Sequence, residues 1–215
     1  MLLKKGLKSI LKKYVGNYIY DRIIKGDKKQ FELGTEVREA TVLIVDTQVR
    51  PISFPEDFNP LSLEEMFSEY INKTFESIEA NDGVVINLVG DSIISVFGLK
   101  NDHHADKACV SALDIMNRMN ESIKVKGLFQ FMIGISTGLV SIGNIGTKNR
   151  FFFSVMGDNV IHSSTLSNLN REYNTCILLS ENTEKRLTRK FITRSVDTIR
   201  VKGSHHVQEI FELVE

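Results

Sequence analysis

Residues 84–97, VVINLVGDSIISVF, predict two short strands joined by a tight hairpin. Both runs are rich in β-branched residues, and only Gly90 and Asp91 separate them, which is the length of a two-residue hairpin turn. The run ATVLIVD at 40–46 is also β-branched, and its continuity is typical of a strand buried on both faces. The sequence therefore predicts three strands here, with one aspartate ending the first strand and another in the hairpin turn.

Helical and extended patterns alternate on both sides of this hairpin. Helices are expected at about 62–80, 102–124, 159–170 and 181–190. Further strands are expected at 128–137, 139–146, 151–156, 176–180, 191–201 and 208–214. The order β-α-β-β-α-β with additions predicts an α+β sandwich, a ferredoxin-like core in which helices cover one face of a largely antiparallel sheet.

The N-terminal segment differs in composition from the rest of the chain. Residues 1–29 hold nine Lys or Arg against two Asp, which gives a net charge of +7. Apolar residues recur there with helical spacing at Leu11, Tyr14, Val15, Tyr18 and Ile19. We expect a basic N-terminal helix and linker over 1–36 and one domain over 37–215. The stripe has the spacing of a core or dimer seam; contact with an anionic membrane, the alternative, is expected only through this helix.

The overall composition is that of a soluble globular chain. Of 215 residues 42% are apolar, enough for a sizeable core, and no run approaches the roughly 20 apolar residues of a membrane span. The net charge is zero, which argues against a nucleic-acid partner. Cys109 and Cys176 show no paired spacing, so we expect two core thiols and a cytoplasmic location.

Asp46 and Asp91 are the residues whose pattern points to chemistry. In the expected core the first strand lies beside the hairpin, so the two carboxylates converge at one sheet edge. Two converging carboxylates form the kind of site that holds Mg²⁺ in phosphoryl and nucleotidyl chemistry. The pattern alone favours a simpler interpretation, in which Asp46 ends a strand and Asp91 occupies a turn that favours Asp.

Six motifs, in order, resemble those of the class III nucleotide cyclases, the catalytic domain of adenylate and guanylate cyclases. They are ATVLIVDT (40–47), LVGDSIISVFG (88–98), GISTG (134–138), IGNIG (142–146), VMGDNV (155–160) and VKG (201–203). The resemblance implies cyclic nucleotide signalling and a head-to-tail dimer with each active site between two domains. One domain presents two metal-binding Asp residues. Its partner presents a Lys and an Asp or Thr that read the base, an Asn that orients the ribose and an Arg that stabilises the transition state.

The resemblance assigns the metal half of this site to Asp46, Asp91 and the backbone of Thr47. Mg²⁺ or Mn²⁺ is the cofactor that these residues would hold. The loop after Asp46 departs from the family, because Val49 replaces a Gly and Arg50 a Phe that let the loop close over the phosphates. Retention of both Asp residues therefore leaves metal binding as an open expectation.

The complementary half of the site is altered at most of its positions. The base-reading positions fall on Asn87, in place of the Lys, and on Ser154. The Asn and Arg positions fall on Ile161 and Thr165, and Lys202 of the closing VKG keeps the Lys that the family places near the triphosphate. Because Ile161 cannot donate a side-chain hydrogen bond and Thr165 carries no charge, these two losses would remove on the order of 10⁵ in rate from a homodimer.

These losses favour a degenerate cyclase domain, inactive as a homodimer, that acts as a regulatory or dimerisation module. One alternative is the metal-bearing subunit of a heterodimeric cyclase, which would convert a nucleoside triphosphate to a 3′,5′-cyclic monophosphate and diphosphate with a complementary domain. Another is an active cyclase with altered base choice, which suits Asn87 and Ser154 but leaves Ile161 and Thr165 without an account. His162, beside Ile161, is not expected to act as a donor in the groove between domains.

Overall fold

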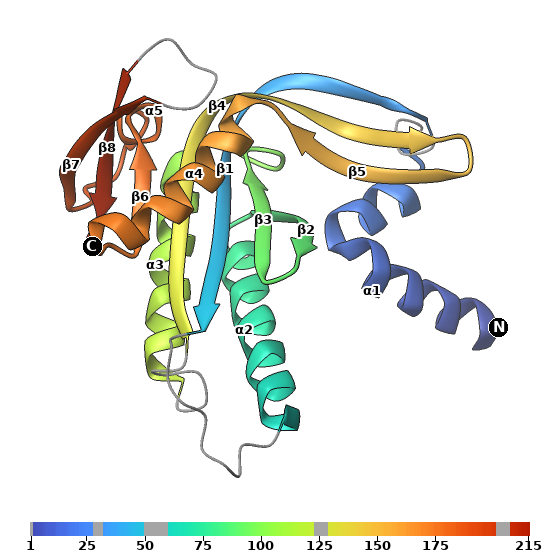
Figure 1. The fold of residues 1–215 in the computed structure, drawn as a ribbon. Helices are drawn as coiled ribbons and strands as arrows, with labels where there is room; N and C mark the ends of the chain where they lie inside the picture. Colours follow the sequence, from blue (N-terminus) through green and yellow to red (C-terminus); the bar gives the residue numbers. More distant parts are fainter. Residues whose placement is uncertain (1, 28–31, 50–59, 123–128, 201–206) are drawn as a thin grey trace.

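The computed structural model describes residues 2–27, 32–49, 60–122, 129–200 and 207–215 (Figure 1). Its helices are α1 (Leu2–Ile24), α2 (Pro60–Ala80), α3 (His104–Glu121), α4 (Asp158–Tyr173) and α5 (Glu181–Glu184). Its strands are β1 (Gly34–Val49), β2 (Val84–Val89), β3 (Ser92–Phe97), β4 (Phe129–Thr147), β5 (Arg150–Met156), β6 (Ile177–Ser180), β7 (Thr193–Arg200) and β8 (Val207–Leu213). The succession β1-α2-β2-β3-α3-β4 confirms the predicted α+β class and the ferredoxin-like order of the core.

The strands form one eight-stranded sheet in the order β2-β3-β1-β4-β6-β8-β7, with β5 paired to β4 outside this row. The pairs β2/β3, β3/β1 and β1/β4 are antiparallel, and β4 and β6 are parallel. The β1/β4 ladder runs from Gly34 opposite Asn144 to Val49 opposite Phe129. β1 thus begins at Gly34, inside the segment expected as a linker.

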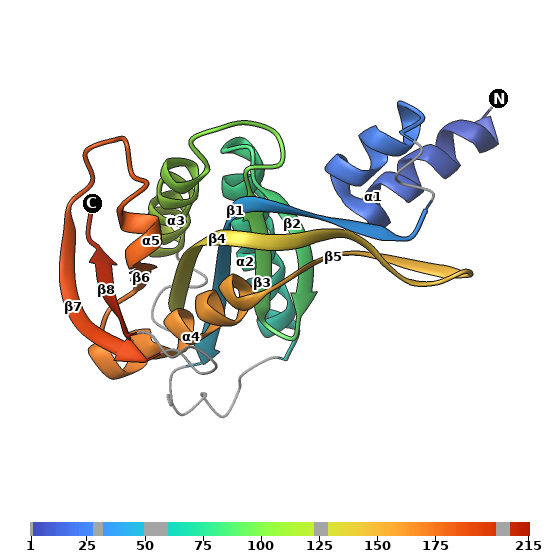
Figure 2. The same ribbon diagram turned by 90° about the horizontal axis from the view of Figure 1, so that it is seen from above.

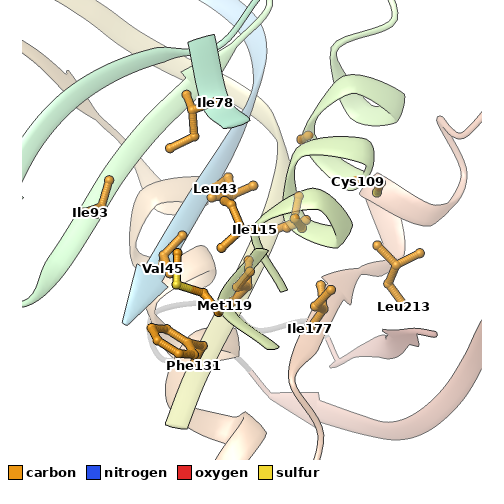
Figure 3. Packing of buried hydrophobic residues seen from close by; sticks show 14 of the residues in the cluster. Leu43, Val45, Ile78, Ile93, Cys109, Ile115, Met119, Phe131, Ile177 and Leu213 are labelled. Carbon is orange, nitrogen blue, oxygen red and sulfur yellow. The ribbon is translucent and has the colours of Figure 1, made fainter. Parts of the chain in front are cut away.

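Helices cover both faces of the sheet, where the sequence predicted one covered face. α2 and α3 lie on one side and α4 lies across the other (Figures 1 and 2). The reason is the continuous apolar run of β1, whose alternate residues point to opposite faces. Leu43 and Val45 join the larger core with α2 and α3 (Figure 3), whereas Val42 and Ile44 belong to a second cluster against which Val160 of α4 packs.

α1 is broken in the middle and packs beside the far end of the sheet. Gly16 has φ 77° and ψ 164°, so the helix kinks there and the expected apolar stripe does not continue along one face. After the kink, the Tyr18 ring lies 5.8 Å from the Phe153 ring of β5, and Asn17 Nδ2 donates to Glu79 Oε2 at 2.7 Å. Before the kink, Tyr14 is 86% exposed. Within the described residues, none of the helices is long and apolar enough to cross a membrane.

Two local predictions were wrong. The helix expected at 181–190 ends at Glu184, because the buried Asp106 of α3 accepts the backbone N–H of Thr188 at 2.9 Å and turns the chain away. Cys109 is a core thiol as expected, but Cys176 is exposed, since it precedes β6 rather than lying inside the strand.

Candidate active site

The structure brings the two aspartates of the sequence motif together through their neighbours. Asp46 lies near the end of β1, and Asp91 lies in the β2–β3 turn, where Gly90 takes φ 64°. Thr47, which follows Asp46, donates its hydroxyl to Asp91 Oδ2 at 3.0 Å. Ser92, which follows Asp91, donates its hydroxyl to Asp46 Oδ1. Each aspartate is thus held by the residue next to the other, and we call this arrangement the reciprocal pair.

A buried tyrosine of α2 contacts the backbone next to the reciprocal pair. Tyr70 of α2 is 1% exposed, and its hydroxyl lies 3.1 Å from the carbonyl oxygen of Asp91 and 3.3 Å from that of Val45. Burial, with smaller contributions from the Asp46 and Asp91 carboxylates, holds the pKa of Tyr70 well above its ordinary value. The phenol therefore stays protonated and donates to one of these carbonyls at neutral pH.

A serine from α4 reaches the same carboxylate from the opposite face of the sheet. Ser167 Oγ lies 2.5 Å from Asp46 Oδ2 and 3.1 Å from the carbonyl oxygen of Met132, which pairs with Asp46 in the β1/β4 ladder. Ser167 is fully buried. Both oxygens of the half-buried Asp46 therefore accept a hydroxyl hydrogen bond, one from the hairpin and one from α4.

The chemistry of the reciprocal pair fits a hard divalent cation. Mg²⁺ is typically bound by one or two carboxylates, with the other positions left to water and substrate phosphates. Asp46 has about four lone-pair positions and uses two for Ser92 and Ser167, so it keeps capacity for a cation, and Asp91 is exposed. Among the described residues no group of three or more His, Cys, Asp and Glu could hold a metal ion, so the pair has no further such ligand there.

The predicted complementary residues lie on other elements, and two of them, Asn87 and Thr165, bond to backbone groups of their own element. Asn87 is exposed on β2, beside a bulge, and its Oδ1 accepts the N–H of Leu88 at 3.0 Å. Thr165 on α4 donates its hydroxyl to the carbonyl of Ile161 at 2.9 Å, and Ile161 is 56% exposed. Ser154 is half-buried on β5, opposite Gly143. Lys202, the fifth position of the complementary half, lies outside the described residues.

Close packing places α4 on the sheet. A Cβ atom on Gly134 of β4 would lie 2.0 Å from the carbonyl oxygen of Ser163 and 2.4 Å from the backbone nitrogen of Ser167, so only glycine leaves room for the helix. A Cβ on Gly138 would lie 2.4 Å from Asn159 Nδ2. Between these glycines, Ser136 donates to Asn159 Oδ1 at 2.9 Å. The motif GISTG is therefore the surface on which α4 rests.

His162 belongs to this packing rather than to an open groove. Its side chain is buried, with Nδ1 3.3 Å from Ser136 Oγ, and its Nε2 is buried without a hydrogen-bond partner in the described structure. Burial lowers the pKa of His162 to about 4. The imidazole is therefore neutral at pH 7 and keeps one N–H donor.

Three residues of the site, Ser92, Ser167 and Tyr70, were not predicted. Ser92 could have been predicted, because it directly follows Asp91 at the end of a two-residue turn. Tyr70 and Ser167 could not, because their contacts depend on how α2 and α4 lie on the two faces of the sheet. The spacing of four residues between Ser163 and Ser167 places both on one face of α4, but it does not predict which groups of the sheet they contact.

Comparisons with known proteins agree with this fold. The family model described as "Adenylate and Guanylate cyclase catalytic domain" matches residues 37–214. Adenylate cyclase 1 of Rhizobium meliloti is 31% identical over 163 residues, 73% of this chain and 24% of that protein. The adenylate cyclase of Anabaena cylindrica is 25% identical over 221 aligned residues, 98% of this chain and 44% of that protein. The chain thus spans less than half the length of these curated relatives.

Solved structures of similar fold include cyclases with different base preference. A bacterial light-regulated adenylyl cyclase superimposes with a TM-score of 0.83 at 19% identity, over 99% of this chain and 63% of that one. The guanylyl cyclase Cya2 superimposes with a TM-score of 0.68 at 25% identity, over 84% of this chain and 94% of that one. The first match extends over nearly the whole chain and so includes the fold of the N-terminal helix.

Proposed function

Because the chain belongs to the family of adenylate and guanylate cyclase catalytic domains, we propose that it keeps the metal half of a cyclase site and has lost the complementary half. In this proposal a homodimer forms no cyclic nucleotide and serves as a regulatory or dimerisation module. The observation that carries the proposal is the occupation of the family's Asn and Arg positions by Ile161 and Thr165. DNA or RNA has no part in it, since the chain has no net charge.

The metal half has the residues that its chemistry requires. Asp46 and Asp91 would hold Mg²⁺ or Mn²⁺, with the backbone of Thr47 as a further ligand. A cation bound there would polarise the phosphoryl oxygens and lower the pKa of an attacking hydroxyl. Thr47 and Ser92 hold the two carboxylates in place through the hydrogen bonds of the reciprocal pair. The two carboxylates are thereby oriented before substrate binds, and such preorganisation is what electrostatic stabilisation of a transition state requires.

The complementary half lacks the groups that would act on the transition state. Ile161 presents a hydrocarbon surface where the family has an Asn, and the hydroxyl of Thr165 is bonded to its own helix. One preorganised donor to a developing oxyanion is typically worth about 10² to 10³ in rate, and an arginine on a transferring phosphoryl group about 10³ to 10⁵. Asn87 is uncharged, so it lacks the positive charge with which the family's Lys reads the base. Its Oδ1 accepts the N–H of Leu88.

A cyclase assay on the purified chain tests this proposal. The chain is incubated separately with ATP and with GTP in the presence of Mn²⁺, and cyclic products are quantified by mass spectrometry. We expect no product above that of a variant with Asp46→Asn. Product that depends on Asp46 would contradict the proposal and would favour an active homodimer with altered base choice.

The intact reciprocal pair favours a second candidate function, that of the metal-bearing subunit of a heterodimeric cyclase. Such a subunit is inactive alone and needs a domain that supplies the missing Lys, Asn and Arg. The test mixes the chain with an active adenylate cyclase domain whose own two metal aspartates are replaced by Asn. Activity in the mixture that is absent from each component, and is lost with Asp46→Asn, is the expected result. No activity in a mixture with verified mixed dimers would rule this function out.

A further inference from the structure

We propose that Ser167 is a positioning residue for the metal-binding carboxylate of Asp46, so that α4 is physically joined to the metal half of its own chain. The inference rests on the proposed metal half, and it adds a residue that the family resemblance does not assign. It starts from one contact, the 2.5 Å separation of Ser167 Oγ and Asp46 Oδ2.

The hydroxyl proton of Ser167 has two acceptors and can serve only one at a time. The carbonyl oxygen of Met132 lies 3.1 Å away, whereas the carboxylate oxygen of Asp46 lies at 2.5 Å. Hydrogen bonds to an ionised acceptor are shorter and about twice as strong as those to a neutral one. Since Ser167 is fully buried, no bulk water competes for its proton. The proton is therefore directed to Asp46.

Two donors together fix the orientation of the Asp46 carboxylate. Ser92 donates to Oδ1 from the hairpin, and Ser167 donates to Oδ2 from α4. With both oxygens held, the carboxylate cannot rotate freely about its Cβ–Cγ bond, and a lone pair on each oxygen stays available for a cation. Groups that orient metal ligands in this way typically contribute about 10-fold to 100-fold in metal affinity.

The short side chain of Ser167 reaches Asp46 because α4 lies close to the sheet at Gly134. Gly134 makes this approach possible, as a Cβ there would lie 2.4 Å from the Ser167 nitrogen. Three residues on the same face of α4 approach backbone carbonyl oxygens of the sheet: Ser163 those of Val42 and Gly134, Asn170 that of Ile133, and Ser167 that of Met132. Of the three, Ser167 is the one that also meets Asp46.

Ser163 is consequently a matched control for Ser167. It lies one helical turn earlier and is fully buried. Its Oγ lies 2.7 and 3.0 Å from two backbone carbonyl oxygens, which are alternative acceptors for its proton, and it has no described contact to Asp46. Replacing either serine by Ala removes one buried hydroxyl from the same interface. A loss that comes from helix–sheet packing would affect both variants, whereas a loss that comes from positioning Asp46 would affect one.

The experiment measures Mn²⁺ affinity of the full chain by electron paramagnetic resonance titration. We expect Ser167→Ala to weaken Mn²⁺ binding about 10-fold, and Ser163→Ala to leave it unchanged within about twofold, although both lower the urea midpoint. If Ser167→Ala does not fold, Ser167→Cys keeps a side chain of the same shape, slightly larger and with only a weak donor, and we expect it to weaken Mn²⁺ binding in the same direction.

Three results would overturn the inference, and they separate it from the proposed function. Unchanged Mn²⁺ affinity in the Ser167 variant, or an equal loss in Ser163→Ala, would refute the positioning role while leaving the metal half in place. A wild-type chain that binds no Mn²⁺ would refute the positioning role together with the proposed metal half.

Discussion

Restoring the complementary half should convert the chain into an enzyme. The variant carries Asn87→Lys, Ile161→Asn and Thr165→Arg. All three positions are exposed or half-buried, and the hydrogen bonds described for Asn87 and Thr165 stay within their own elements, so the fold should tolerate the changes. An Asn worth about 10² and an Arg worth about 10³ together predict a gain of roughly 10⁵ in rate, or about 7 kcal/mol of transition-state stabilisation.

The assay compares the triple variant with the wild-type chain under the same Mn²⁺ and ATP concentrations, at protein concentrations where dimers are verified. The single variants Ile161→Asn and Thr165→Arg should each recover only part of the rate. Addition of Asp46→Asn to the triple variant should abolish the gain. A folded, dimeric triple variant that binds Mn²⁺ and gains less than about tenfold would refute the reasoning, because the loss of rate would then lie outside these positions.

Three further predictions concern the packing beneath α4 and the two thiols. Gly134→Ala should lower the free energy of unfolding by about 3 kcal/mol in urea titrations, because its Cβ meets the backbone of α4. Gly6→Ala, with open space at its Cβ, should be neutral or slightly stabilising; equal effects of the two changes would contradict the close packing at Gly134. His162 has its pKa lowered to about 4, so the unfolded chain binds a proton between pH 6.5 and 4 that the folded chain does not. As the pH is lowered through that window, the free energy of unfolding should therefore fall by up to about 3 kcal/mol more in the wild type than in His162→Leu. Parallel pH profiles of the two proteins would show that the imidazole is not buried. Burial raises the pKa of the Cys109 thiol while Cys176 is exposed, so an aromatic disulfide reagent should react quickly with one thiol in the native chain and with two in urea; two fast native reactions would place Cys109 at the surface.

Much of the fold could be predicted because its signals are local. The hairpin at 84–97 is defined by two β-branched runs and the turn between them, and both strands have the expected bounds. The kink at Gly16 and the early end of α5 were not predictable in the same way. The kink accompanies a positive φ at Gly16, a conformation that glycine permits but does not require, and α5 ends before the point where the backbone N–H of Thr188 bonds to Asp106.

The candidate site likewise contains residues that could be predicted from the sequence and residues that could not. The expected strand order was enough to place Asp46 and Asp91 at one edge of the sheet, and the family resemblance gave them an expected metal-binding role. Ser167 was not predicted, since 121 residues separate it from Asp46 and its contact depends on the closeness of α4 to β4. The order of the core strands can be inferred from the succession of strands and helices along the chain, whereas the separation of a helix from a sheet is decided by the side chains between them.

The glycines of GISTG bear on what a family signature measures. Gly134 and Gly138 are both explained by steric fit, since each lies under a backbone or side-chain atom of α4. These residues would be required in any chain that builds this joint between helix and sheet, whether or not it turns over a nucleotide. A match to the GISTG motif therefore indicates that α4 packs closely on β4, and it does not by itself indicate catalysis. The outward side of the same helix, at Ile161 and Thr165, is where working and silent members of the family would have to be told apart.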